Sequence, residues 1–307
     1  QALSTSTFYL GNWMSVKELA LMAAIPQKEV VGMRLKEEVE FGLNVNHNQK
    51  QVADEDKICL GNLVVSGIEK EIPVSISKKD LDRHIFIAGV TGSGKTTTCH
   101  NLLIDSDLPF LVIEPAKTEY RILLDRFPEM EIFTIGSNVA PFRLNSFEIF
   151  EGENITSRVD MIRASIEAAF DMEAAIPQLI EATIYKTYED FGWDINSNRN
   201  TKNTNPFAPG SYAFPTLDDM MKNIPEVVEK QGFDTKLKGD YIGSIRARLQ
   251  GLTLGVKGMM LNCKRSIDFD ELLDKRVVLE LEELRNGGEK ALVIGFIMIN
   301  LLEAIRR

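Results

Sequence analysis

The sequence predicts an α/β fold with a mostly parallel sheet, a helical insertion and a small β-rich module ahead of it. Three observations support this prediction. A short apolar run, a glycine-rich loop and a helix start follow one another without a gap at 84–105. Apolar strand-like runs and helical patterns then alternate along the chain, which is typical of a parallel sheet covered by helices. Short apolar pieces separated by glycine and proline occupy 26–80.

The first 80 residues are expected to form a β-rich, barrel-like assembly module. A helical pattern at 16–24 stops at Pro26. Alternating apolar and polar residues bounded by glycine or proline indicate strands and turns. The strands are predicted at 30–35, 39–45, 58–65 and 72–76, and a turn or helix cap at 77–80.

Residues 89–96, GVTGSGKT, fit the pattern G-x-x-x-x-G-K-[ST] of a phosphate-binding loop, or P-loop. Its glycines let backbone N–H groups turn toward an anion, and the following helix N-terminus adds partial positive charge. Lys95 would supply a charge for the β- and γ-phosphates, and the Thr96 hydroxyl is placed to bind Mg²⁺. The residues expected to bind ATP are Gly89, Thr91, Gly92, Ser93, Gly94, Lys95, Thr96 and Thr97.

The remaining strands of the nucleotide-binding domain, 81–307, follow from short apolar runs. The run at 85–88 precedes the P-loop, and further runs lie at 110–114 and 131–135 and from Arg276 onward. Each is short enough for a buried strand. Gly287 and Gly288 then turn the chain into a final helix.

Helical periodicity indicates an insertion at about 153–260 within this domain. Helices are predicted at 156–191, 216–229 with Thr216 as its N-cap, and 241–252. A polar loop at 192–215 separates the first two, and loops of this length are usually functional or disordered. A short amphipathic piece follows at 266–275.

Composition limits the classes of function. The formal net charge is −10 over 307 residues, so no overall basic field attracts nucleic acid, and DNA would need a local surface such as a ring pore. Three widely spaced cysteines without a C-x-x-C motif fit a reducing cytosol. The most apolar run, 291–302, is too short to span a bilayer. We therefore expect a cytoplasmic location and no membrane partner.

Two segments carry a family resemblance: FIAGVTGSGKTTT at 86–98 and FLVIEPAKTEYR at 110–121 resemble HerA/FtsK-type ATPases, and bacterial HerA-like proteins in particular. Weaker similarities extend it to nearly the whole chain, at 24–32, 41–42, 141–148, 192–193 and 214–219. The resemblance implies a RecA-like core and a hexameric ring that hydrolyses ATP and moves duplex DNA through its pore. It also implies a role in anti-phage defence beside an effector, either a nuclease or a sirtuin-type enzyme.

The candidate catalytic residues are Lys95, Thr96, Glu114, Glu119, Arg246 and Arg248. Ligands of open α/β sheets bind at the carboxyl ends of the strands. This rule predicts four charged residues near the nucleotide or a subunit boundary: Glu114, Lys117, Glu119 and Arg121. A solvated loop with internal ion pairs is the alternative. A ring NTPase is expected to use an arginine finger from a neighbouring subunit. Arg246, Arg248 and Arg121 are its candidates, with ordinary surface ion pairs as the alternative.

The Walker B carboxylate is the one departure from the family pattern. The resemblance places its strand after a helix like 288–307, so the domain is expected to be truncated before it, and both chain ends look like fragment edges. Alternatively, VVLELEE at 277–283 is Walker B, and Glu280, Glu282 or Glu283 is the base.

Two functions of different class remain open. One is an ATP-driven DNA motor, in which Lys202, Lys236 and Lys238 on polar stretches could contact DNA. The other is a ring scaffold, gated by ATP, that assembles or regulates a partner effector. A P-loop kinase or GTPase is disfavoured because no Asn-Lys-x-Asp motif is present and because 114–121 follows the HerA-like pattern.

Overall fold

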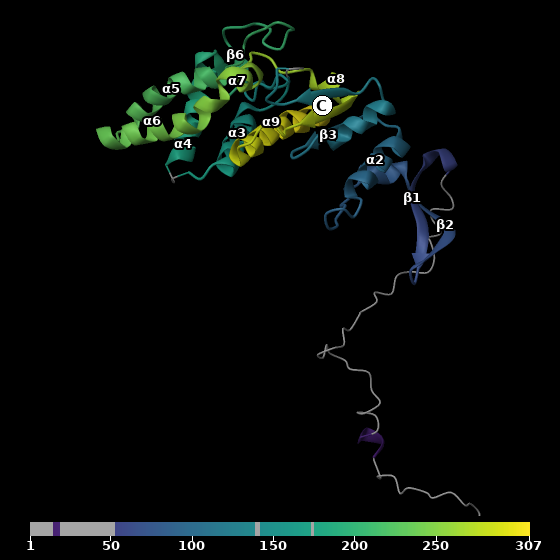
Figure 1. Ribbon diagram of the computed structural model, residues 1–307. Coiled ribbons are helices and arrows are strands. Elements are labelled where there is room, and N and C mark those ends of the chain that lie inside the picture. Colours follow the sequence, from purple (N-terminus) through teal and green to yellow (C-terminus); the bar gives the residue numbers. More distant parts are fainter. Residues whose placement is uncertain (1–14, 19–52, 139–141, 173–174) are drawn as a thin grey trace, which may run out of the picture. The chain divides into compact units, whose positions relative to one another are not determined.

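The structure of the chain is a computed structural model that describes residues 15–18, 53–138, 142–172 and 175–307 (Figure 1). The chain divides into two compact units. The larger contains 53–60 and 76–307, and the smaller takes in 61–75. The strands predicted at 30–35 and 39–45, and residues 19–24 of the predicted first helix, lie outside the described residues.

A β-hairpin is the main described feature before the P-loop. Strands β1 (Lys57–Val65) and β2 (Ile68–Ser77) form a two-stranded sheet, which confirms the strands predicted at 58–65 and 72–76. Ser66 and Gly67 connect them with φ values of 49° and 75°, a turn whose twist suits paired antiparallel strands. The short 3₁₀ helix η2 (Asp54–Asp56) precedes the hairpin. The helix η3 (Lys78–Asp82) follows, and a capping box formed by Ser77 and Asp80 begins it, as predicted.

Three parallel strands form the sheet of the larger unit. They are β3 (Phe110–Glu114), β7 (Arg276–Glu280) and β4 (Glu131–Thr134), in the order β3-β7-β4. Val277 and Leu279 point into the main hydrophobic core, while Val278 packs into a second cluster on the other face. Because both faces are covered, the strands are continuous apolar runs. This confirms the strands predicted near 110, 131 and 276.

The strand predicted at 85–88 is wrong for the described structure. Residues 84–90 form no strand, and Phe86 and Val90 are 92% and 79% exposed. An apolar run predicts a strand only if a neighbouring strand supplies the hydrogen bonds and the cover. Among the described strands, none pairs with this segment, so its apolar side chains remain at the surface.

Helices cover both faces of the sheet. The P-loop helix α2 (Lys95–Ser106) and the 3₁₀ helix η4 (Glu119–Asp125) pack on the Val278 face through Leu103, Leu123 and neighbouring apolar side chains. Helices α3 (Ile155–Ala169) and α9 (Gly287–Arg306) pack against each other on the opposite face. The P-loop and the helical insertion thus belong to opposite faces.

The insertion contains α4 (Ile176–Asp190), α5 (Leu217–Lys230) and α6 (Thr235–Leu249), which lie side by side (Figure 1). The single helix predicted at 156–191 is wrong, because α3 ends at Ala169 and α4 starts anew at Ile176. Pro177 lies in the first turn of α4, where a missing N–H costs nothing. Thr216 caps α5 as predicted. The chain continues through η5 (Gln250–Leu252), α7 (Gly255–Leu261) and α8 (Phe269–Leu273).

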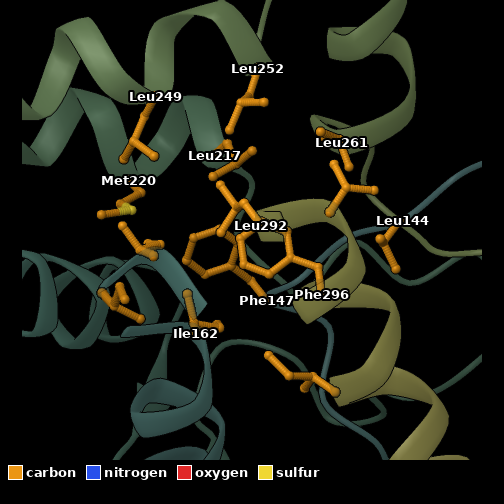
Figure 2. Close-up of a cluster of buried hydrophobic side chains, with 14 of the residues drawn as sticks. Leu144, Phe147, Ile162, Leu217, Met220, Leu249, Leu252, Leu261, Leu292 and Phe296 are labelled. Carbon is orange, nitrogen blue, oxygen red and sulfur yellow. The ribbon is translucent and has the colours of Figure 1, made fainter. Parts of the chain in front are cut away.

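One hydrophobic core joins the insertion to the sheet. Figure 2 shows Leu292 and Phe296 of α9 directed toward Phe147, with Leu217 and Leu252 of the insertion on the same cluster. A buried ion pair adds to this junction. The guanidinium of Arg158 on α3 is fully buried, bonds Glu153 at 2.6 Å and donates to Asn300 of α9 at 2.6 Å. The insertion is therefore part of the core of this unit.

The polar loop at 192–215 is ordered around one aromatic residue. Trp193 stacks on Phe214 with a ring-centroid distance of 5.5 Å, and its Nε1 donates to the carbonyl of Ala213 at 2.7 Å. Strands β5 (Trp193–Asp194) and β6 (Arg199–Asn200) form a short antiparallel pair at its start. Of the two alternatives for this loop, disorder is therefore wrong. Among the helices of the described part of the chain, none is both long and apolar enough to cross a membrane.

Candidate nucleotide site

The glycine-rich loop at 89–96 has the backbone that its sequence predicts. Gly92 and Gly94 have φ values of 82° and 88°, in the left-handed region that glycine enters most easily. Gly94 is the N-cap of α2. At Gly89 the constraint is space, since an added Cβ would lie 2.3 Å from the Ser93 hydroxyl oxygen. Backbone conformation thus requires glycine at two of these positions, and space requires it at the third.

Lys95 closes this loop. Its Nζ donates to the carbonyl oxygens of Gly89 and Val90, both at 2.9 Å. The ammonium thus lies inside the loop, next to the first turn of α2, where the helix end already favours an anion. Thr91, Ser93 and Thr97 are exposed. The structure brings Lys95 together with the loop residues that the sequence predicted as phosphate ligands.

Thr96 contacts the acidic residue that begins η4, after the turn that follows β3. Its Oγ1 donates to Oε2 of Glu119 at 2.8 Å, and Lys117 Nζ lies 2.5 Å from the other oxygen, Oε1. The hydrogen bond from Lys117, followed by that from Thr96, lowers the pKa of Glu119. Conversely, Glu119 raises the pKa of Lys117. Glu119 is therefore a carboxylate at neutral pH, and it connects two predicted site residues.

Glu114 has a different environment. Its Oε1 accepts the backbone N–H groups of Ala116 at 3.4 Å and Lys117 at 3.2 Å. The turn after β3 is held a second time by Lys290 of α9, whose Nζ donates to the carbonyl of Pro115. In this structure, Glu114 shapes the loop that presents Glu119.

Arg121 forms an ion pair with Glu280 at the carboxyl end of β7. Its Nε and Nη2 each lie 2.7 Å from a carboxylate oxygen, and Thr134 donates to the same carboxylate at 3.0 Å. The pairing raises the pKa of Arg121. Glu280 is fully buried, whereas Glu282 and Glu283 are exposed. As a candidate base, Glu280 is thus already bound by three hydrogen bonds, and Arg121, as a candidate finger, is bound within its own chain.

Arg246 and Arg248 lie in the last turn of α6. Arg248 donates to the carbonyls of Ser244 at 2.9 Å and Asp171 at 2.8 Å. Arg246 is exposed. The structure does not bring either arginine together with Lys95 of the same chain.

Two of the three lysines considered for DNA contact bind acceptors within their own chain. Lys202 donates to the carbonyl of Asp190 at 2.5 Å, and Lys238 pairs with Glu229 at 2.7 Å. Lys236 is exposed.

His100 and Tyr120 are neighbours of the site that the sequence analysis missed. Their rings meet edge to face with centroids 4.8 Å apart. His100 Nε2 is buried without a hydrogen-bond partner, and burial lowers the pKa of the ring, against an opposing effect of Glu119 and Glu114. Sequence spacing could have identified His100, because it lies four residues after Thr96 and therefore on the same face of α2.

Comparison with known proteins supports this description. Residues 58–177 match the family described as "Helicase HerA, central domain". The solved structure of VirB4 from Thermoanaerobacter pseudethanolicus is similar, with a TM-score of 0.54 and 15% sequence identity. At 15% identity, that similarity shows the fold alone. It covers 83% of this chain and 66% of the VirB4 chain, so this chain spans less than two thirds of that protein's length. A search of curated proteins found no match to this chain.

Proposed function

We propose that this HerA-like P-loop ATPase hydrolyses ATP as the motor of a hexameric ring that translocates duplex DNA. The observation that carries the proposal is the geometry of the P-loop. Its glycines have the required backbone, Lys95 Nζ lies within the loop, and Thr96 occupies the first turn of α2. The family match at 58–177 includes this segment.

The residues present also fit a magnesium ion bound with the nucleotide. Thr96 offers a hydroxyl and Glu119 a carboxylate, and oxygen atoms are the ligands that Mg²⁺ prefers. Thr96 would hold the ion. When bound, Mg²⁺ neutralises negative charge on the phosphates. Lys95 and the N-terminus of α2 supply the remaining positive charge from the protein.

The ring, the DNA and the effector follow from the resemblance to HerA-like proteins. Arg246 and Arg248 are the candidates for a finger that acts on a neighbouring subunit's nucleotide. Arg248 bonds Ser244 and Asp171 of its own chain, and Arg246 is exposed. Lys202, Lys236 and Lys238 lie on polar surface segments and are candidates for DNA contact. A nuclease or sirtuin-type effector, a defence role and a cytoplasmic location complete the proposal.

A ring scaffold gated by ATP is the second candidate. The net charge of −10 favours it, as do the contacts of Lys202 and Lys238 with their own chain. Lysines already bound within their own chain attract DNA phosphates less strongly than a free basic patch does. In this function ATP binding would hold the ring that docks or regulates the effector.

The two functions are separated by ATP hydrolysis, measured with and without linear duplex DNA, in the parent protein and in Lys95→Ala. The motor predicts a rate that depends on Lys95 and rises strongly with DNA. The scaffold predicts a hydrolysis rate that depends on Lys95 and is the same with and without DNA. It also predicts a protein partner whose copurification survives nuclease treatment. Hydrolysis that is equal in Lys95→Ala would exclude both.

A further inference from the structure

We propose that Glu119 is a positioning residue that orients the Thr96 hydroxyl toward the Mg²⁺ of the bound nucleotide. This inference rests on the proposed ATPase function. It assigns a specific role to a residue of the loop after β3, which is separate in sequence from both the P-loop and β7.

The orientation of one hydroxyl group is the first step. A threonine hydroxyl has one proton to donate and two lone pairs to offer. In the structure the proton goes to Glu119 Oε2 at 2.8 Å. The lone pairs then point away from Glu119 and are free for a cation. Without that acceptor the hydroxyl can rotate and present its proton instead. Carboxylates behind a metal ligand commonly fix its orientation in this way.

The rigidity of the loop is the second step. Lys117 holds the other oxygen of Glu119 at 2.5 Å, so the carboxylate is bound at both oxygens. The loop itself is fixed by the turn at Glu114, by Lys290 on the carbonyl of Pro115 and by the ion pair of Arg121 with Glu280. These contacts come from α9 and β7 as well as from the loop. The segment that presents Glu119 is therefore linked to β7 and α9.

The charge of Glu119 provides a way to separate positioning from general support. A carboxylate near bound phosphates repels them when no metal is present. Removing it should leave ATP binding without metal unchanged or slightly tighter. Binding with Mg²⁺ should weaken, because the hydroxyl is no longer oriented. A residue that merely supports the loop would weaken both.

The experiment titrates a fluorescent, non-hydrolysable ATP analogue into the full chain, once with Mg²⁺ and once with EDTA. The readout is the ratio of the dissociation constant in EDTA to that in Mg²⁺. Glu119→Ala should lower this ratio about tenfold or more, the usual effect of losing a partner of a metal ligand. Glu119→Gln keeps an acceptor oxygen, so its ratio should lie between those of the parent and of Glu119→Ala. Glu271→Gln, which changes a surface glutamate paired with Lys275, should behave like the parent.

Two results would overturn the inference. One is an unchanged ratio in Glu119→Ala, which includes an equal loss of affinity in both conditions, and the other is tighter binding with Mg²⁺. The latter would mean that Glu119 obstructs the site. Thermal unfolding of each variant verifies that the compared proteins are folded. If the parent shows no Lys95-dependent binding of the analogue, the proposed function fails and the inference fails with it. Lys95-dependent binding with an unchanged ratio removes the inference alone.

Discussion

Arg121 and Glu280, 159 residues apart in the chain, form an ion pair with two hydrogen bonds of 2.7 Å. The Glu280 side chain is fully buried, whereas that of Arg121 is 53% exposed. Thr134, at the end of β4, donates to the same carboxylate. In the strand register, Glu114 of β3 and Thr134 of β4 both lie opposite Glu280. The buried carboxylate at the end of β7 therefore bonds the end of β4 and Arg121, two residues after Glu119.

We predict that Arg121→Ala lowers the free energy of unfolding by about 2 kcal/mol. Removing one partner leaves a buried carboxylate without its counter-charge, and the cost stays below that of a fully buried pair because Arg121 is half exposed. Urea denaturation measures this change. Arg306→Ala, which breaks an exposed ion pair with Glu303, should change stability by less than about 0.5 kcal/mol.

The double variant Arg121→Met/Glu280→Leu should recover most of the stability lost in Arg121→Ala, because apolar pairs often replace buried ion pairs at little cost. It should still impair the site, since the loop after β3 loses its link to β7. An Arg121→Ala protein as stable as the parent would show that this ion pair does not hold the strand ends together.

We predict that Gly89→Ala weakens nucleotide binding at least about tenfold. The new Cβ would lie 2.3 Å from the Ser93 hydroxyl oxygen and 3.2 Å from its Cβ, so the Ser93 hydroxyl must rotate away and the backbone at Ser93 must shift. Adding Ser93→Ala removes the closest atom and should restore part of the affinity. The matched control is Gly239→Ala on α6, where no atom lies within 4 Å and helix propensity favours alanine. Affinity in Gly89→Ala equal to that of the parent would contradict the proposed close packing.

We predict that His100 makes stability depend on pH below about 6.5. Burial lowers its pKa in the folded chain, so the unfolded chain takes up the proton first as the pH falls. Stability is therefore complete above the ordinary pKa of histidine and decreases below it. His100→Phe keeps a ring against Tyr120 and removes this titration. Its melting temperature, compared with the parent from pH 7.5 to 5.5, should fall less steeply. If melting temperature falls equally with pH in both proteins, His100 does not cause the pH dependence. The other two histidines are present in both proteins, so they do not contribute to the difference.

Local patterns in the sequence were enough to predict the P-loop, the buried strands and the capped helices. Gly89 to Thr96 has a fixed spacing, and Thr216 precedes a helix whose third residue completes its capping box. These features depend on neighbours along the chain. The pairing of strands does not, so the apolar residues at 85–88 predicted a strand that the described sheet lacks. The contact of Glu280 with Arg121 was equally inaccessible, because no periodicity reports a pair so distant in sequence.

The aromatic cluster at the 192–215 loop yields the last prediction, Trp193→Ala. Trp193 is nearly fully buried, stacks on Phe214 and donates its indole N–H to Ala213. Truncating a buried tryptophan leaves a cavity and an unpaired carbonyl, so the free energy of unfolding should fall by about 3–5 kcal/mol. Limited proteolysis should cut within 195–212 faster than in the parent, since the loop loses the residue around which it is ordered. Tyr212→Ala removes an exposed ring from the same loop and should leave both measurements close to the parent values. If Trp193→Ala loses stability while its loop resists protease as the parent does, the order of the loop comes from its own hydrogen bonds, such as those that Asp194 and Asn200 accept from backbone N–H groups.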